Sequence, residues 1–464
     1  MKTTMDYRKA ILVSLPFFAI TIFWQAYDTI MPQILVYHFG MNSTTLGMVM
    51  GIDNLVALVF LPLFGALSDR INSKMGRRTP LILWGTIGGA VSFVLMGLAD
   101  NVQLARLAAA GIPAKFAAAT TGAAKAALIG EVAAVQKGNM GTFALMMGAL
   151  LLGVFLMSLF RSPAAALAAD VFIRPQRSKG NAVLNILGGL AGVVFLVLNK
   201  KMASLFGGYM NLMAVSAVVM LIALAVYMLF VREPKLVRQV EEDNKRLGLT
   251  EEIDTRKGAK LKPEVMRSLI YILAVVIFVY MGYNAFSTHF AIYAIKQLGM
   301  TPSSISGPLL VRVFSVLIFA IPSAIISTKI GRKMTARIGL VILAVTVFMI
   351  YFLTPETAKF LSPIFIVYGI GFAMVSVHLG PMVVELCSSA DVGRYMGYYY
   401  LATTVAQIVT PALAGIFLDR FGQRTIALYS AVFMGIAFAG TFFIKHGDAK
   451  PVSIKAADVL AAAD

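Results

Sequence analysis

Residues 65–78 have the sequence GALSDRINSKMGRR and separate two long apolar runs, residues 46–67 and 80–98. A helix of about 20 residues crosses a bilayer, so each run can span a membrane. The stretch between them is therefore a short loop at a membrane face. It carries four basic residues against a single acid: Arg70, Lys74, Arg77 and Arg78 against Asp69. Short loops rich in Lys and Arg face the cytoplasm, and we expect the same of this one.

The composition indicates a polytopic membrane protein. Of 464 residues, 59% are hydrophobic and 13% are charged, whereas soluble domains are about 25% charged. The formal net charge is +18, but the basic residues lie in loops between apolar runs. Membrane topology and anionic lipid headgroups explain this excess, and we expect no nucleic-acid partner. The single cysteine, Cys387, excludes an intramolecular disulfide.

Twelve apolar runs are long enough to span a bilayer. They are residues 10–31, 46–67, 80–98, 142–167, 181–198, 209–231, 267–295, 304–327, 336–353, 360–386, 395–418 and 425–444. The first run lacks a small-residue cleavage site, so we interpret it as a retained helix and not as a signal peptide. If the N-terminus is inside, 29 of the 40 Lys and Arg residues lie on the inner side, ten lie on the outer side, and Arg312 lies within a helix. This asymmetry predicts a multi-pass protein of the plasma (inner) membrane with both termini in the cytoplasm.

The predicted domains are two six-helix halves. Residues 1–231 form the first half, residues 232–266 a charged cytoplasmic linker, residues 267–446 the second half, and residues 447–464 a cytoplasmic tail. Residues 99–141 are a long Ala-, Gly- and Lys-rich segment for which we expect an extracellular insertion of one or two weakly amphipathic helices. A lid over the outer mouth or a docking element for a partner is the alternative interpretation of that insertion.

The two halves resemble repeats. The basic loop after the second helix has a shorter counterpart, TKIGRK at residues 328–333, after the eighth. Asp170 and Arg177 follow the fourth helix, and Glu385 and Arg394 follow the tenth in the same order. Acid-then-arginine pairs at equivalent positions are expected of transporters built from internal repeats.

The basic loop also resembles the loop between the second and third helices of major facilitator superfamily transporters, roughly G-x-L-x-D-R-x-G-R-R. The matching residues are Gly65, Asp69, Arg70, Gly76, Arg77 and Arg78. Residues 71–75 are a longer spacer, similar to that of the glycoside–pentoside–hexuronide:cation symporters and the sucrose-transporter-like proteins. Residues 161–170, RSPAAALAAD, resemble the R-x-x-x-A-L-x-x-D element of the latter, although the acid is one position later.

Ionisable and polar side chains inside membrane helices are costly, so each one is a candidate site. The candidate substrate- or ion-binding residues are Trp24, Gln25, Asp28, Asp53, Asn54, Asn284, His289 and Arg312. We expect Trp24, Gln25 and Asp28 to share one helix face. We place Asp28 and His289 near the outer ends of their helices, with two acids of the first half facing Arg312 and His289 across a central cavity.

Charged residues at the cytoplasmic helix ends are candidate gating elements. These are Asp69, Arg70, Arg77, Arg78, Arg161, Asp170, Arg177, Glu385 and Arg394. The resemblance implies that Asp69 braces the opposite half in the outward-facing state. Arg161 and Asp170 are out of helical register, so we expect Asp170 to pair with Arg174 or Arg177 instead.

The resemblance implies a twelve-helix, all-α secondary transporter of the major facilitator fold that works by alternating access. The implied function is sugar or glycoside symport with H⁺ or Na⁺. Asp28 or Asp53 would then bind the ion, Trp24 would stack on the sugar, and Gln25 and Asn284 would bond its hydroxyls. We expect no enzymatic activity, no metal site and no cofactor beyond the coupling ion, and a monomer in the bilayer. The alternatives are a proton-coupled exporter of drugs or metabolites and a non-transporting membrane receptor or scaffold.

Overall fold

The computed structural model describes residues 5–119, 122–246, 261–387 and 391–448. All regular structure in these ranges is helical. The long helices and the linker helix are α1 (Tyr7–Tyr37), α2 (Ser43–Arg70), α3 (Thr79–Ala109), α6 (Met140–Val171), α7 (Arg174–Met202), α8 (Met210–Phe230), α9 (Glu233–Arg246), α10 (Pro263–Leu298), α11 (Ser306–Ile330), α12 (Arg332–Ile350), α13 (Leu361–Val384), α14 (Val392–Phe421) and α15 (Ile426–Gly440). Two shorter helices are α4 (Ile112–Ala118) and α5 (Gly122–Lys137), and 3₁₀ turns occupy Ala358–Phe360, Gln423–Thr425 and Thr441–Phe443.

Twelve of the helices in the described ranges are long and apolar enough to cross a membrane. They correspond one for one to the twelve predicted runs, so the predicted all-α twelve-helix architecture is confirmed. Several helices, such as α1, α3 and α10, are longer than the predicted apolar runs, because residues beyond each run continue the hydrogen-bonded spiral. Side-chain caps fix some of these ends: the Asn42 amide oxygen accepts from the backbone N–H of Thr45 at 2.8 Å and begins α2.

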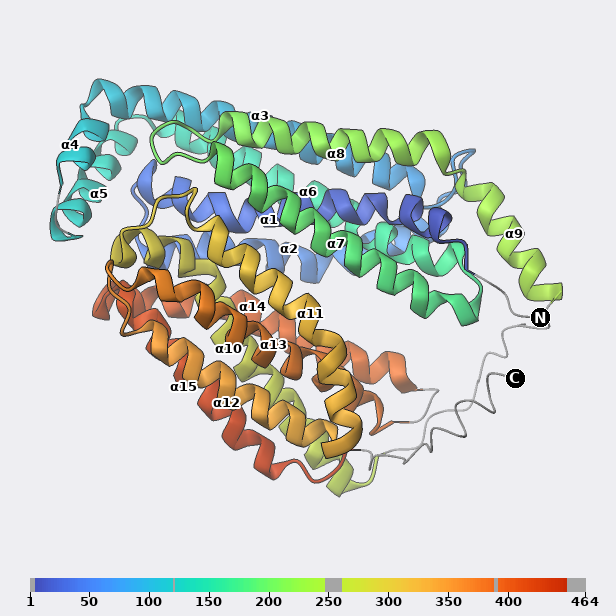
Figure 1. The fold of residues 1–464 in the computed structure, drawn as a ribbon. Coiled ribbons are helices and arrows are strands. Elements are labelled where there is room, and N and C mark those ends of the chain that lie inside the picture. Colours follow the sequence, from blue (N-terminus) through green and yellow to red (C-terminus); the bar gives the residue numbers. More distant parts are fainter. Residues whose placement is uncertain (1–4, 120–121, 247–260, 388–390, 449–464) are drawn as a thin grey trace.

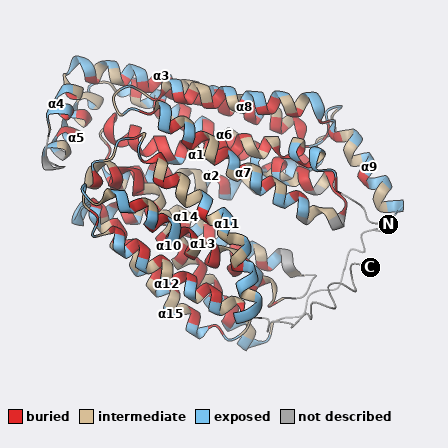
Figure 2. Ribbon diagram, viewed as in Figure 1, coloured by how far each residue is buried: buried red, intermediate tan, exposed pale blue. Residues whose placement is uncertain are grey.

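The helices form two layers that diverge toward one end (Figure 1). Helices α1–α8 make up one layer and α10–α15 the other. We call the end at which α1 begins and α9 lies the terminal face, and the end that carries α4 and α5 the opposite face. The layers meet near the opposite face and separate toward the terminal face. Buried residues are concentrated inside each layer, and exposed apolar residues cover its outer side (Figure 2).

The predicted insertion at residues 99–141 begins inside a helix. Helix α3 continues to Ala109, and α4 and α5 follow as two short helices at the opposite face. Lys115 of α4 pairs with Glu131 of α5 at 2.5 Å. Helix α5 packs on the end of α1 so closely that a Cβ at Gly40 would overlap the backbone of Ala133. The insertion is therefore folded onto the bundle.

A buried ion pair holds the opposite-face end of the first layer together. His38 Nδ1 lies 2.5 Å from Asp100 Oδ1, and both residues are fully buried. His38 Nε2 lies 2.5 Å from the carbonyl oxygen of Leu205, so both ring nitrogens face acceptors. Burial acts to lower the pKa of His38, but Asp100 and the Leu205 carbonyl outweigh it, and the net pKa is raised. An imidazolium ion satisfies both acceptors, and it ties the end of α1 to α3 and to the loop before α8.

Candidate functional site

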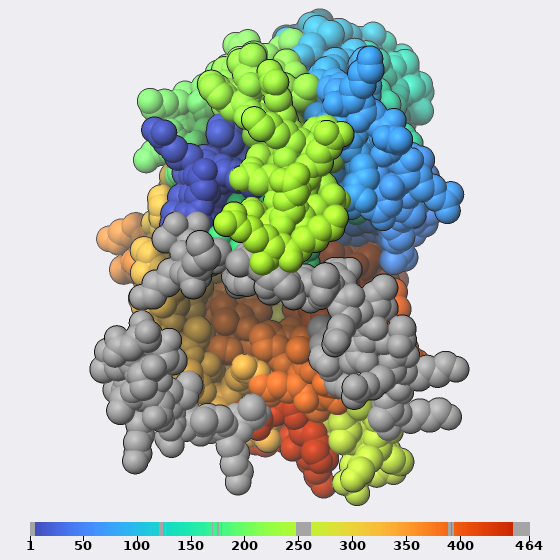
Figure 3. Space-filling view, turned by 90° about the vertical axis from the view of Figure 1, so that its right-hand side faces the viewer, coloured from blue at the N-terminus to red at the C-terminus, as the bar shows by residue number. Residues whose placement is uncertain are grey.

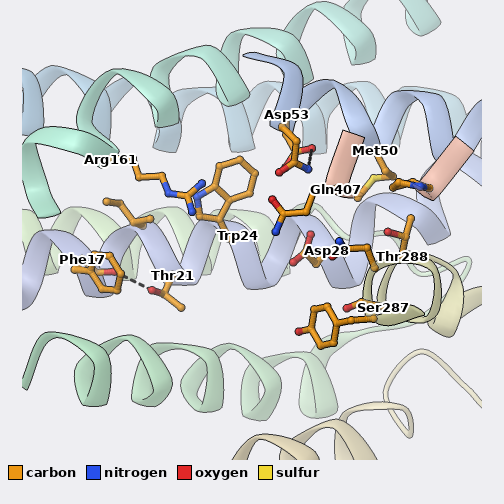
Figure 4. Close-up of a pocket in the computed structure, with 15 residues that line it drawn as sticks. Phe17, Thr21, Trp24, Asp28, Met50, Asp53, Arg161, Ser287, Thr288 and Gln407 are labelled. Carbon is orange, nitrogen blue, oxygen red and sulfur yellow. Dashed lines mark hydrogen bonds between the residues drawn. The ribbon is translucent and has the colours of Figure 1, made fainter. Parts of the chain in front are cut away.

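A polar cavity of about 320 Å³ lies between the two layers. Figure 4 shows its lining, which comes from α1, α2 and α6 of the first layer and from α10 and α14 of the second. The lining residues are Phe17, Ile20, Thr21, Trp24, Asp28, Met50, Asp53, Asn54, Arg161, Tyr283, Asn284, Ser287, Thr288, Gln407 and Pro411. Pockets that bury one small ligand are apolar with a few convergent polar groups. This one is richer in charge and hydroxyl groups than that pattern.

Asp28 and Asp53 are both directed into this cavity (Figure 4). Asp28 is solvent-exposed although it lies in the middle of the bundle, because the cavity admits solvent to it. Asp53 Oδ1 accepts a hydrogen bond from the Asn54 amide at 2.8 Å. The expected position of Asp28 near the end of its helix is wrong, because α1 extends to Tyr37 and places Asp28 about 13 Å from that end.

Arg161 supplies a positive charge to the same cavity. Its guanidinium carbon lies 5.8 Å from the ring centroid of Trp24, a cation–π distance. Arg161 is solvent-exposed on its cavity side yet lies deep between the layers, close enough to both Asp28 and Asp53 to interact with them electrostatically. We expected Arg161 at a helix end as a gating residue. That location is wrong, because α6 continues to Val171 and leaves Arg161 inside the span.

Two hydrogen-bond donors at the cavity have no partner among the described residues. These are the indole Nε1 of Trp24 and the amide Nδ2 of Asn284. Trp24 is held by edge-to-face contacts with Phe23 and Tyr27, whose ring centroids lie 5.6 and 5.5 Å away. A buried donor without an acceptor costs free energy, so both atoms favour a ligand that offers acceptor oxygens.

Three predicted binding residues are not part of the cavity lining. Gln25 donates to Thr29 Oγ1 at 3.2 Å, and its amide oxygen lies near Gly192 of α7. The expectation that Gln25 shares a face with Trp24 and Asp28 is therefore wrong: adjacent helix positions diverge by about 100°. His289 is fully buried, with Nε2 3.0 Å from the carbonyl oxygen of Pro411 in α14, so its expected place at the cavity is also wrong.

Arg312 is the third residue outside the lining. Its guanidinium lies over the Phe365 ring at 5.8 Å, beside the cavity in the second layer. It remains near enough to Asp28 for an electrostatic interaction with that carboxylate. Arg312 can thus act on the charge of the site without touching a ligand.

A second cavity of about 580 Å³ adjoins the first and leads toward the terminal face. Asn54, Arg161 and Gln407 line both cavities. The second one continues along α2 to Pro62 and along α14 to Tyr400, in the direction of the terminal face on both helices. The two cavities thus share a wall and together extend between the layers in the direction of the terminal face.

At the opposite face the layers are joined by a cap across the interface. The Asp419 carboxylate of α14 accepts from the backbone N–H groups of Ser43 and Thr44, at 2.9 and 2.8 Å, and from Thr44 Oγ1 at 2.6 Å. These N–H groups begin α2, where the helix dipole favours negative charge. A Cβ at Gly47 would overlap the carbonyl of Pro411, so glycine permits the close crossing of α2 and α14. Asn199 of α7 adds a bond to Ser306 Oγ of α11 at 2.8 Å.

The predicted gating residues at the terminal face pair within their own layers. Arg78 bonds Asp69 at 2.6 Å and Asp170 at 2.8 Å, and Arg77 lies 3.8 Å from Asp170. The predicted pairing of Asp170 with Arg177 is wrong, because Arg177 Nε donates to the carbonyl of Phe172 at 3.4 Å instead. The side chain of Arg174 lies outside the described residues.

The remaining gating candidates are also placed at this face. In the second layer Glu385 pairs with Arg332. Arg394 donates to the Tyr398 hydroxyl at 3.1 Å, and Arg70 is exposed at the end of α2. These residues thus lie on both layers at the face where the layers are apart.

Comparison with known proteins agrees with this architecture. The family model described as Major Facilitator Superfamily matches residues 13–142, 138–375 and 272–461. The chain belongs to the major facilitator superfamily. The predicted superfamily membership is therefore confirmed.

Solved transporters of the superfamily share the fold along almost the whole chain. A bacterial homologue of the human lysosomal transporter Spinster, inward-facing and occupied, has a TM-score of 0.65 at 13% identity, covering 95% of this chain and 97% of the homologue. The inward-open xylose transporter XylE from E. coli has a TM-score of 0.63 at 14% identity, and the match covers 98% of this chain and 99% of XylE. The nucleoside transporter NupG has a TM-score of 0.63 at 14% identity, and the match covers 94% of this chain and 100% of NupG. At such identities the likeness extends to the fold alone.

One curated sequence is similar over a short segment. The general alpha-glucoside permease of Schizosaccharomyces pombe is 42% identical over 50 residues. The match covers 11% of this chain and 9% of the permease, so it spans a small part of either protein.

Several lining residues of this superfamily member were missed by sequence reasoning. Arg161 was predicted as a gating residue and not as a cavity residue, although it lies within the apolar run at residues 142–167, where the rule that singled out Arg312 also applies. Gln407 is an amide inside a spanning helix and gave a similar but weaker signal. No sequence signal marked the hydroxyl residues Thr21, Ser287 and Thr288, because hydroxyl groups in membrane helices commonly bond to their own backbone.

Proposed function

We propose that the protein is a cation-coupled symporter of a sugar or glycoside, working by alternating access. The observation that supports this most is the composition of the polar cavity. The half-buried indole of Trp24 in the cavity wall suits the apolar face of a sugar ring, and the unpartnered donors of Trp24 and Asn284 suit its oxygens. Asp28 and Asp53 provide oxygen ligands for a proton or Na⁺. The short likeness to an alpha-glucoside permease favours the same class.

The proposal assigns the residues distinct roles. Trp24 stacks on the substrate, Asn284 and Gln407 bond its hydroxyls, and one of the two carboxylates binds the coupling ion. Arg161 keeps the stacking ring in place through its cation–π contact and balances the carboxylates. Sugar-binding sites of this kind combine one large aromatic surface with several directional hydrogen bonds.

Trp24→Ala is expected to weaken sugar binding by about two- to twelvefold, because aromatic contacts contribute about 0.5–1.5 kcal/mol beyond their buried area. Trp24→Phe retains an aromatic ring, and its sugar affinity is expected to lie between those of the parent protein and Trp24→Ala. The test is counterflow in proteoliposomes against a panel of mono- and disaccharides, with and without Na⁺. The second tryptophan, Trp84, is 64% exposed on the outer side of α3, and Trp84→Ala is a matched control.

The same pair of tryptophans allows a binding measurement without transport. In a Trp84→Phe background, Trp24 is the single source of indole fluorescence. A sugar that shows counterflow is expected to change that emission with the same concentration dependence. Absence of counterflow for every sugar, or unchanged affinity in Trp24→Ala, contradicts the proposal and favours a different solute.

We further propose that the terminal face is cytoplasmic, so that the structure is an inward-facing state. The excess of Lys and Arg in loops at this face supports the orientation. The similar structures of the Spinster homologue and XylE are inward-facing and inward-open.

This orientation predicts opposite labelling of two single cysteines. In a Cys387→Ser background, Lys125→Cys in α5 is expected to react with a membrane-impermeant maleimide added to intact cells. Lys245→Cys in α9 is expected to react only after the membrane is opened. Reaction of Lys245→Cys in intact cells reverses the proposed orientation.

A further inference from the structure

A separate basic pocket lies at the terminal face, away from the transport cavity. It has a volume of about 940 Å³ and is formed by α9, the end of α8 and the loop after α2. Figure 3 shows α9 crossing this face of the first layer beside the segment that carries the loop. Its lining residues are Lys74, Met75, Thr79, Met228, Val231, Arg232, Pro234, Lys235, Arg238, Gln239 and Glu242.

The polar part of the lining is strongly cationic. Four basic side chains face one carboxylate, Glu242, and none of the four forms an ion pair within the described part of the chain: Lys74, Arg232, Lys235 and Arg238. Arg232, just before α9, and Lys235 and Arg238 within it recur every third residue, which places them on one side of the helix. All four are exposed. Arg and Lys groups gathered in this way bind phosphate.

The pocket is held in place by a buried carboxylate of the same helix. Glu233 is 1% exposed and accepts from the backbone N–H groups of Arg77, Arg78 and Thr79 at the start of α3. The charge of Glu233 is therefore taken up by the start of α3 and does not compensate the basic groups of the pocket. The same bonds fix α9 against the first layer, so the cationic side chains share a rigid base.

The other part of the lining is apolar and adjoins the lipid-facing surface. Met75, Met228, Val231 and Pro234 contribute it. The last residues of α8, Leu229 and Phe230, are 76% and 68% exposed, as expected of side chains that face acyl chains. The pocket thus lies where the apolar surface of the bundle ends, at the depth of lipid headgroups.

We propose that this pocket binds the phosphate group of an anionic phospholipid. The cationic groups contact the phosphate, and the apolar part contacts the first carbons of the acyl chains. A free phosphate ion offers the same charge but makes no use of the apolar part. The site lies outside the substrate pathway, so this inference does not depend on which solute is transported.

The test compares three probes on the purified full-length chain. Phosphatidylglycerol, phosphatidylcholine and inorganic phosphate are titrated, and bound lipid is counted by native mass spectrometry while the melting temperature is followed. We expect phosphatidylglycerol to bind and to raise the melting temperature, with phosphatidylcholine much weaker. If millimolar inorganic phosphate displaces phosphatidylglycerol and stabilises the protein equally, the ligand is a soluble phosphate and the lipid proposal is overturned.

A pair of charge variants on α9 locates the site. Lys235→Gln/Arg238→Gln removes two charges from the pocket, and we expect about 30-fold weaker phosphatidylglycerol binding. Lys245→Gln/Arg246→Gln removes two exposed charges from the same helix outside the pocket and is expected to change affinity little. Lys74→Gln, on the loop, is expected to weaken binding about fivefold without touching α9. The proposal is overturned if the two double variants lose phosphatidylglycerol affinity equally, or if neither Lys235→Gln/Arg238→Gln nor Lys74→Gln loses affinity.

Discussion

Asp419→Ala is expected to shift the protein toward states that are open at the opposite face. The Asp419 carboxylate accepts three hydrogen bonds from the start of α2 across the interface between the layers. These bonds exist only while the layers meet at this face, so their loss destabilises that state alone. Hydrogen bonds to a charged group contribute about 1.5–3 kcal/mol each. A net loss of about 2 kcal/mol changes the population ratio about 30-fold.

The shift can be measured as a distance between the layers. Spin labels at Lys201→Cys and Lys359→Cys, in a Cys387→Ser background, report on the two sides of the opposite face. We expect a second, longer distance to become populated in Asp419→Ala. Glu356→Gln removes a fully exposed acid from the same face and is the matched control.

A steric variant independently tests the same contact between the two layers at the opposite face. Gly47→Val places side-chain atoms where the carbonyl of Pro411 lies, so α2 and α14 cannot approach as closely. It is expected to populate the longer distance even with Asp419 intact. Unchanged distances in both variants would show that other contacts, such as Asn199 with Ser306, hold the face closed.

The helices of this protein could be predicted because their signal is local. Each spanning helix is an uninterrupted apolar run, and the bilayer requires that its backbone bonds close within the segment. The positions of the helix ends were predicted less accurately. The residues after Met31 and Leu167 continue α1 and α6 as helix, and that extension placed Asp28 and Arg161 in the middle of the bundle.

The partners of charged residues could not be predicted because they are distant in sequence. Asp170 bonds Arg78 across 92 positions, and Asp419 bonds Ser43 across 376. Nearby arginines such as Arg177 were plausible partners for Asp170, but the fold brings the end of α2 and the start of α3 closer. The loop Gly-Arg-Arg pattern indicated that these residues matter without indicating which acid they contact.

The sequence also could not indicate which side chains of α1 point into the cavity. This helix packs against helices of both layers and is apolar around most of its circumference, so no polar stripe marks the cavity side. Trp24 and Gln25 are neighbours in the sequence, yet only Trp24 lines the cavity. His289 illustrates the same limit on α10: a lone histidine gave no sign that it bonds the Pro411 carbonyl of α14.

Asp28→Asn and Asp53→Asn are expected to separate coupling from substrate exchange. Both carboxylates reach the cavity, and both interact with Arg161, so either can carry the proton or Na⁺ that drives uptake. An amide of the same size keeps the hydrogen-bonding shape of the site but cannot take up a proton or balance a cation. The coupling variant is therefore expected to exchange substrate across the membrane while it no longer concentrates it.

The measurement uses proteoliposomes with an imposed ion gradient. A tenfold proton or Na⁺ gradient supports about tenfold accumulation at one ion per substrate, since each factor of ten is about 1.4 kcal/mol. In the coupling variant the accumulation ratio is expected to fall to unity, with counterflow retained. Glu264→Gln, which removes an exposed acid at the start of α10, is the control and is expected to accumulate substrate like the parent protein. If both aspartate variants accumulate substrate as well as the parent, the coupling ion binds outside this cavity.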